Sequence, residues 1–162
     1  EVNVLKISFF AMIKVLMVCL GNICRSPLAE GILVSKVNSD EIFVDSAGTA
    51  AYHVGKLPDQ RSIEVAGKYG IDITNQRARK FTVKDFDTFD YIYAMDESNY
   101  QNILMLARTN DDKSKVQLIL NETHPTKNLA VPDPYYGGNQ GFENIYTMLE
   151  QACEIIANKL SK

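Results

Sequence analysis

The apolar residues of this chain fall into short continuous runs, separated by segments in which they recur at helical spacing. Residues 13–18 form the first run, and their apolar, partly β-branched side chains predict a buried strand. A helix is predicted for residues 28–37, where Leu28, Ile32 and Leu33 share one face. The same two patterns predict further strands at residues 42–46, 89–94 and 116–120, and further helices at residues 62–69, 99–107 and 141–160.

Turn and capping signals support this division. Gly70 follows the predicted helix 62–69, and the run Met-Asp-Glu-Ser at residues 95–98 is a helix N-cap signal. Strands that alternate with helices imply a mostly parallel sheet covered on both faces, which is an α/β fold. Ligands of such sheets bind beyond the carboxyl ends of the strands. Cys19, directly after the first strand, lies at such an end.

Composition and charge narrow the class of protein. The chain has 162 residues, of which 46% are hydrophobic, and this predicts one domain with one core. A net charge of −3 argues against a general nucleic-acid binder. The three cysteines form an odd set without disulfide spacing, so we expect a reducing compartment, the cytoplasm.

The N-terminal segment is apolar but does not predict a membrane span. Lys6 and Lys14 interrupt it, and the uncharged run 7–13 is far shorter than the roughly 20 residues a span needs. Met12 resembles a native start that leads directly into the first strand. We therefore expect residues 1–11 to be an expression remnant or an upstream extension, and residues 12–162 to be the single domain.

The loop after the first predicted strand carries the clearest chemical signal, Val18-Cys19-Leu20-Gly21-Asn22-Ile23-Cys24-Arg25-Ser26-Pro27. We expect the next helix to begin at residue 26 or 27, with its proline at the first position and Glu30 in the first turn. Free N–H groups at a helix N-terminus favour an anion, and Arg25 can bind two phosphoryl oxygens at once. Residues 20–26 are therefore predicted to bind phosphate around the sulfur of Cys19.

The positive charge of the helix N-terminus and of Arg25 also makes Cys19 a candidate nucleophile, because thiols at helix N-termini and beside cations ionise readily. Gly21 is expected to turn the backbone with positive φ, and Asn22 to tolerate left-handed geometry. A hydroxyl at Ser26 can stabilise the thiolate. The alternative, in which Cys19 and Cys24 are core residues, leaves the accompanying Gly, Asn, Arg, Ser and Pro unexplained.

A second signal is the rigid loop Val131-Pro132-Asp133-Pro134-Tyr135-Tyr136-Gly137-Gly138. A phosphate ester of an aromatic alcohol needs a proton on its leaving oxygen, and Asp133 on a restrained loop can supply one. Taken alone, the same residues are ordinary turn formers. Beside a thiolate loop, the acid is the favoured interpretation.

These two loops, with two further motifs, resemble the low-molecular-weight protein tyrosine phosphatases from about Met12 to the last helix. The further motifs are Asp45-Ser46-Ala47-Gly48-Thr49 and Ala94-Met95-Asp96-Glu97-Ser98-Asn99. The resemblance implies a three-layer flavodoxin-like fold with four parallel strands, without metal or cofactor. It also implies hydrolysis of phosphotyrosine and other aryl phosphates: Cys19 attacks phosphorus, Arg25 and loop amides bind its oxygens, and Asp133 protonates the phenol and then activates water.

The resemblance assigns supporting roles as well. Asn22 and Ser46 are implied to hold the loop in shape, and Ser26 to assist the leaving thiolate. The implied substrate rim comprises Leu20, Ile23, Tyr52 and Tyr135. One position departs from the family pattern: Gln76 stands where the family usually has histidine, and we expect it to hydrogen-bond the Asn22 side chain without carrying charge.

Two other functions fit parts of this pattern. A thiol-dependent arsenate reductase shares the loop but needs a downstream cysteine pair, whereas this chain has Cys153 alone, which we expect in the core. A non-catalytic phosphotyrosine-binding module needs no acid such as Asp133. The expected partners are phosphotyrosine proteins or small aryl phosphates, with no nucleic acid and no membrane. The oligomeric state is open, a monomer being the expectation.

Overall fold

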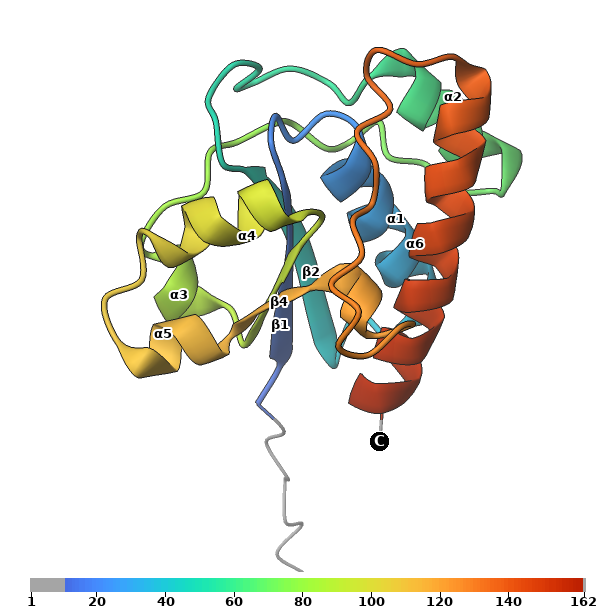
Figure 1. Ribbon diagram of the computed structural model, residues 1–162. Coiled ribbons are helices and arrows are strands. Elements are labelled where there is room, and N and C mark those ends of the chain that lie inside the picture. Colours follow the sequence, from blue (N-terminus) through green and yellow to red (C-terminus); the bar gives the residue numbers. More distant parts are fainter. Residues whose placement is uncertain (1–10, 162) are drawn as a thin grey trace, which may run out of the picture.

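The computed structural model describes residues 11–161. Its sheet contains β1 (Ile13–Cys19), β2 (Ile42–Gly48), β3 (Tyr91–Ala94) and β4 (Val116–Leu118). These four strands are parallel and lie in the order β2-β1-β3-β4 (Figure 1). The predicted α/β fold with a four-stranded parallel sheet is therefore confirmed.

Helices cover both faces of this sheet (Figure 1). One face carries α1 (Arg25–Lys36), α2 (Gln60–Lys68) and α6 (Asn139–Leu160), and the other carries α3 (Asp85–Thr88), α4 (Glu97–Leu104) and α5 (Asn110–Ser114). A short 3-10 helix, η1 (Ile119–Asn121), follows β4. The three layers match the predicted flavodoxin-like arrangement.

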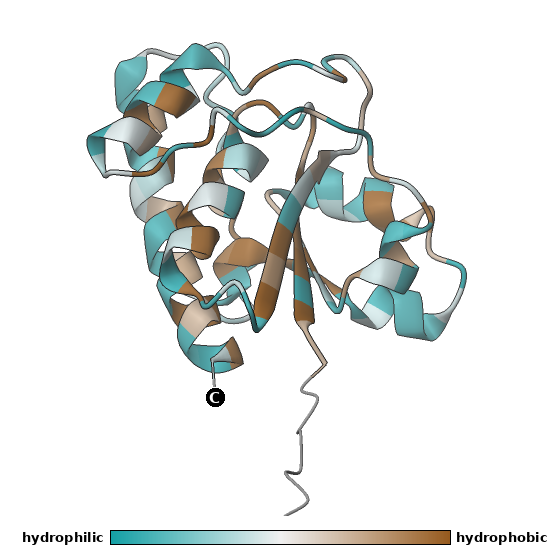
Figure 2. Ribbon diagram, turned by 180° about the vertical axis from the view of Figure 1, so that it is seen from behind, coloured by the Kyte–Doolittle hydropathy of each residue, from teal (hydrophilic) through white to brown (hydrophobic). Residues whose placement is uncertain are grey.

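The central strand β1 explains why its sequence is a continuous apolar run. Val15 and Met17 face the core under α1 and α6, whereas Leu16 and Val18 face the core on the opposite side. Because helices cover both faces of β1, neither set of alternating side chains faces solvent, and both sets are apolar. Burying each such side chain contributes roughly 1.5–3 kcal/mol. Figure 2 shows hydrophobic residues along the strands and, alternating with hydrophilic ones, along the helices that cover them.

Several predicted boundaries shift. The predicted strand 89–94 begins only at Tyr91, and strand 116–120 ends at Leu118, where the chain turns into η1. The helix predicted from residue 99 begins at Glu97, because Asp96 accepts a hydrogen bond from the N–H of Asn99 and caps it. The short helices α3 and α5 were not predicted. Their four and five residues are too few to show a helical period.

The N-terminal predictions fall at the edge of the described part. Residues 1–10 lie outside it, so the proposed extension and the domain boundary stay predictions. Among residues 11–161, no helix combines the length and the apolar character required to cross a membrane.

Candidate active site

The predicted phosphate loop joins the carboxyl end of β1 to the first turn of α1. Asn22 has a φ of 56°, which confirms the expected left-handed geometry. The prediction for Gly21 is wrong, since the described glycines with positive φ are Gly55 and Gly70. A Cβ at Gly21 would instead lie 2.9 Å from Cδ2 of the His53 side chain, so a larger residue here would have to displace His53.

The start of α1 also differs from the expectation. Helix α1 begins at Arg25 with Cys24 as N-cap, so Pro27 is its third residue rather than its first. Glu30 consequently lies beyond the first turn, which contains no acidic residue. The N-terminal N–H groups of α1 thus face the loop without a carboxylate of their own helix beside them, which suits an anionic ligand.

Cys19 lies at the base of this loop and is 3% exposed. Its Sγ is 3.0 Å from Oγ of Ser26. Ser26 Oγ already accepts a hydrogen bond of 2.8 Å from Nδ2 of Asn22. The single hydroxyl hydrogen of Ser26 has two acceptors within reach, the sulfur at 3.0 Å and the carbonyl of Ala47 at 3.4 Å, and a thiolate at Cys19 is the nearer and better one.

The guanidinium of Arg25, 2% exposed as a residue, is held from two directions. Nη1 donates to Oδ2 of Asp96 at 2.6 Å and to the carbonyl of Val131 at 3.0 Å. Nη2 lies 3.7 Å from Oδ2 of Asp133. Asp96 follows β3, whereas Asp133 lies on the long loop between η1 and α6, so Arg25 joins the phosphate loop to two other segments at the site.

A buried hydrogen-bond network extends behind the loop. Nδ2 of Asn22 also donates to Oγ of Ser46 at 2.9 Å, and Oδ1 of Asn22 accepts from the N–H of Arg79 at 3.0 Å. The hydroxyl of Ser46 donates to Oε1 of Glu30 at 2.7 Å. Burial raises the pKa of Glu30 to about 7. The network therefore runs from the cysteine sulfur to a carboxyl group with a neutral-range pKa.

The expected contact between Gln76 and the Asn22 side chain is wrong. Nε2 of Gln76 donates to the carbonyl of Pro27 at 3.0 Å, and its Oε1 is buried without a hydrogen-bond partner. The amide of Asn22 has no free donor for Gln76, because both of its hydrogens bind serine hydroxyls. Gln76 therefore supports the first turns of α1 rather than the loop.

A cavity of about 300 Å³ opens above Cys19. Its lining comprises Cys19, Leu20, Gly21, Ile23, Cys24, Arg25, Tyr52, His53, Asp133, Tyr135 and Tyr136. The predicted nucleophile, arginine, acid and rim residues thus share one cavity, and His53 and Tyr136, to which no role is assigned, also line it. Asn22, Ser26 and Ser46 lie behind this cavity, and Gln76 does not line it.

Asp133 is accessible to a ligand, with its side chain 41% exposed. Its Oδ1 accepts from the N–H of Tyr135 at 3.0 Å, an Asx turn that fixes the carboxyl group on its own loop. Oδ2 faces the guanidinium of Arg25. One carboxylate oxygen thus orients the side chain while the other points toward the phosphate site.

Comparison with known proteins identifies the family. A family model for low molecular weight phosphotyrosine protein phosphatases matches residues 14–162. The chain belongs to this family. The phosphatase is 46% identical to the low molecular weight phosphotyrosine protein phosphatase of Schizosaccharomyces pombe over 142 residues, 85% of this chain and 90% of that relative.

Solved structures agree with this assignment. The phosphatase matches the protein tyrosine phosphatase of Entamoeba histolytica, solved with Hepes in its active site, with a TM-score of 0.85 and 38% identity, over 92% of this chain and 97% of that one. It also matches a Drosophila arginine phosphatase with a TM-score of 0.84 and 34% identity, over 93% and 99% of the two chains. The phosphatase is thus a hydrolase that works through a cysteinyl-phosphate, and the reductase and binding-module alternatives are set aside.

Sequence reasoning missed the functional contacts of Asp96 and Glu30. Asp96 was visible as an N-cap, but the ion pair with Arg25 spans 71 positions and has no local signal. Glu30 is a single acid within an otherwise apolar stretch of α1, which is a sign of a buried contact. Cys153, in contrast, lies fully buried in the core as predicted. Across residues 11–161 no group of three potential ligands could hold a metal ion.

Proposed function

We propose that this phosphatase hydrolyses phosphotyrosine in proteins and small aryl phosphates, with Cys19 as nucleophile, Arg25 as phosphate ligand and Asp133 as acid and base. The observation that carries the proposal is the single cavity in which a buried cysteine, a buried arginine and an accessible carboxyl group meet. Cys19 and Arg25 share one loop, but Asp133 comes from a distant part of the chain, so no local feature explains its position beside them. A shared chemical task explains it.

In the first step, the phosphate group binds to the free N–H groups of residues 20–26 and to Arg25. The hydrogen bond to Asp96 orients this guanidinium before the ligand arrives, so binding requires little reorganisation. The thiolate of Cys19 attacks phosphorus as the bond to the phenol oxygen breaks. Asp133, in its protonated form, transfers its proton to that oxygen, and neutral phenol leaves.

In the second step, water attacks the phosphorus of the cysteinyl-phosphate. Asp133, now a carboxylate, accepts a proton from that water, and the sulfur–phosphorus bond breaks. The hydroxyl of Ser26, 3.0 Å from the sulfur, donates to the departing thiolate and lowers its energy as a leaving group. Inorganic phosphate then leaves, and both Cys19 and Asp133 return to their starting states.

The cavity walls favour an aromatic substrate. Leu20, Ile23, Tyr52 and Tyr135 surround the opening with apolar and aromatic surface, which matches the faces of a phenyl ring. We propose a monomer, because all the assigned residues come from one chain. A cytoplasmic location is proposed because Cys19 must stay reduced, and all three cysteines are free thiols.

The variant Cys19→Ser tests this function. A serine hydroxyl is un-ionised at neutral pH, so turnover of phosphotyrosine peptides should vanish while vanadate still binds through Arg25 and the loop amides. Retained turnover would contradict the assignment of the nucleophile. Parallel assays of the parent enzyme with phosphotyrosine and phosphoarginine peptides test the aromatic site. Faster hydrolysis of phosphoarginine would contradict the proposed substrate class.

A further inference from the structure

The first turn of α2 lies against the phosphate loop. Asp59, the N-cap of α2, donates its backbone N–H to the carbonyl of Ile23 at 2.7 Å. The fully buried Ser62 donates its hydroxyl to the carbonyl of Cys24 at 3.1 Å. Two consecutive carbonyls of the phosphate loop are therefore bound by one turn of one helix.

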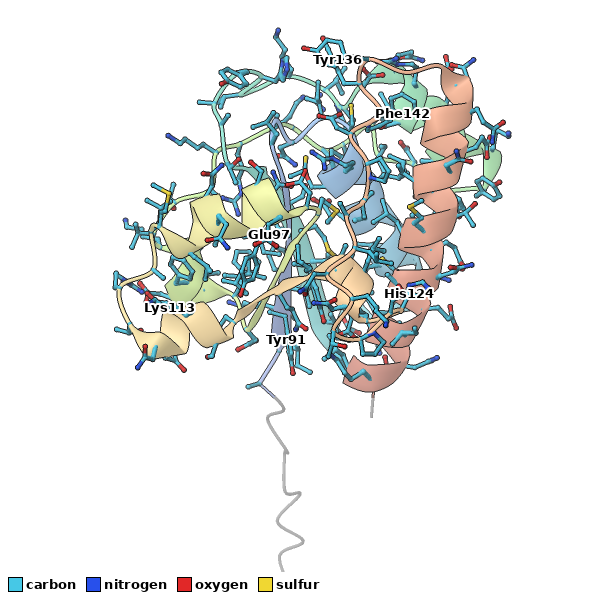
Figure 3. All side chains as sticks on the ribbon, in the orientation of Figure 1. Tyr91, Glu97, Lys113, His124, Tyr136 and Phe142 are labelled. Atoms are coloured by element: carbon cyan, nitrogen blue, oxygen red, sulfur yellow. The ribbon has the colours of Figure 1, made fainter. Side chains whose placement is uncertain are left out.

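The same turn also reaches the loop that carries Asp133. Nη2 of Arg61 donates to the carbonyl of Tyr135 at 2.9 Å, and Nη1 donates to the carbonyl of Gly137 at 3.1 Å. The guanidinium carbon lies 4.6 Å from the ring centre of Phe142, in the first turns of α6. Figure 3 shows Phe142 and Tyr136 at the same end of the molecule, near the first turn of α6.

Arg61 cannot adopt many orientations, because Asp59 binds it as well. Nε of Arg61 donates to Oδ1 of Asp59 and Nη2 donates to Oδ2, both at 3.0 Å. This is the two-point arrangement in which a planar guanidinium is best oriented by a carboxylate. These hydrogen bonds lower the pKa of Asp59, which keeps it ionised at neutral pH.

We propose that Asp59 and Arg61 form a bracket that sets the position of Asp133 relative to Cys19, with Arg61 as the positioning residue for the acid. Through Asp59 the bracket is fixed to the phosphate loop, and through Arg61 it is fixed to the acid loop. The inference rests on the proposed role of Asp133.

The acid loop is held before Asp133 at Val131, whose N–H donates to the carbonyl of Met95 at 2.8 Å and whose carbonyl accepts from Arg25 at 3.0 Å, but the part after Asp133 needs an anchor of its own. The hydrogen bonds of Tyr135 and Gly137 N–H groups are local, to Asp133 and to Pro134, and fix the shape of the loop rather than its place. The two bonds from Arg61 instead join the loop to a helix more than 70 positions earlier in the chain. A proton donor displaced by about 1 Å can lose on the order of 100-fold in rate.

The test is the dependence of kcat/KM on the leaving group. Aryl phosphates whose phenols span a range of acidity are assayed with the parent enzyme, Arg61→Met, Arg61→Lys and Asp133→Asn. Phenols that are weak acids need the proton from Asp133, whereas strongly acidic phenols leave without it. Arg61→Met should therefore lose about 10-fold or more with weakly acidic phenols and little with strongly acidic ones. Lysine cannot bind two carbonyls and Asp59 in one plane, so the loss of kcat/KM in Arg61→Lys should lie between those of the parent and Arg61→Met.

Lys68→Met is the matched control. Lys68 also joins α2 to α6, through an ion pair with Glu143, but it does not touch the acid loop. This variant should keep the parent dependence on the leaving group. Comparing substrates within one variant cancels any loss of folded protein, so a merely structural effect of Arg61 would not change the slope.

Two outcomes overturn the bracket and are distinguishable. If Arg61→Met and Arg61→Lys lose the same factor with every leaving group while Asp133→Asn shows a steep dependence, Asp133 is the acid but Arg61 does not position it. If Asp133→Asn itself shows no dependence, the acid role fails and the bracket fails with it. If the bracket exists, Arg61→Met should add little in the Asp133→Asn background, because the two residues act on one step.

Discussion

Arg25 and Asp96 form a short ion pair, with Nη1 of the arginine 2.6 Å from Oδ2 of the aspartate, at the point where β1 and β3 end. Asp96 has two tasks at once, because its Oδ1 caps α4 by accepting from the N–H of Asn99 at 2.8 Å. The cap fixes the carboxylate, and the carboxylate fixes the arginine. The N-terminus of α4, on one face of the sheet, thus orients Arg25, which belongs to a helix on the other face.

The variant Asp96→Asn separates these two tasks. Asparagine caps helices as well as aspartate does, so the cap of α4 should survive and any loss of stability should come from the weakened contact with the buried Arg25. Arg25 loses a charged acceptor, which is worth about 1.5–3 kcal/mol, so kcat/KM for aryl phosphates should fall by roughly 10- to 100-fold. Steady-state kinetics and urea unfolding measure the two effects. Unchanged kinetics would show that Val131 and the phosphate loop orient Arg25 without help.

Asp133→Asn tests the acid. The amide cannot donate an acidic proton, so kcat/KM for phosphotyrosine should fall by roughly 10²–10⁴. The loss should shrink with a phenol acidic enough to leave unprotonated. The test measures the ratio of the parent rate to the variant rate for phosphotyrosine and for the phosphate ester of such an acidic phenol. An equal loss for both would assign Asp133 a structural role.

Glu30 predicts a pH dependence of stability. Burial raises its pKa from 4.5 to about 7, so between these values the folded chain binds a proton that the unfolded chain has lost. This group's contribution is therefore fully present below pH 4.5 and is lost as the pH rises toward 7. The loss is on the order of 3 kcal/mol at most.

Glu30→Gln removes this titration and still offers an acceptor to the hydroxyl of Ser46. Urea unfolding of both proteins at pH 5 and pH 8 measures the free energy of unfolding. The parent should lose more stability than Glu30→Gln across this interval, since all other groups are common to both. Equal losses would mean that Glu30 titrates alike in the folded and unfolded chains.

Cys24 predicts recovery from oxidation. Burial raises the pKa of Cys24 to about 12, so it stays a protonated thiol and leaves peroxide to react with Cys19. The resulting sulfenic acid can condense with the Cys24 thiol, forming a disulfide and releasing water. Dithiothreitol should then restore most activity of the parent and far less of Cys24→Ser. Equal recovery, with no Cys19–Cys24 bond by mass spectrometry, would reduce Cys24 to a packing residue.

The sequence alone determined the features that depend on neighbours in the chain. The apolar run of β1 predicts a strand covered on both faces, because alternate residues pack into the cores on opposite faces of the sheet. The spacing of Cys19 and Arg25 around a helix N-terminus likewise makes a phosphate loop with little help from elsewhere. Local hydrogen bonds and side-chain periodicity are read directly from the order of residues.

The tertiary structure decided which distant groups meet these local ones. Asn22 binds Ser46 rather than Gln76 because of how β2 aligns with β1. Arg25 binds Asp96 because of how β3 aligns with β1. The bracket of Asp59 and Arg61 depends on where α2 packs. Such contacts join residues tens of positions apart, and a polar side chain has many possible partners until the core places one of them within about 3 Å.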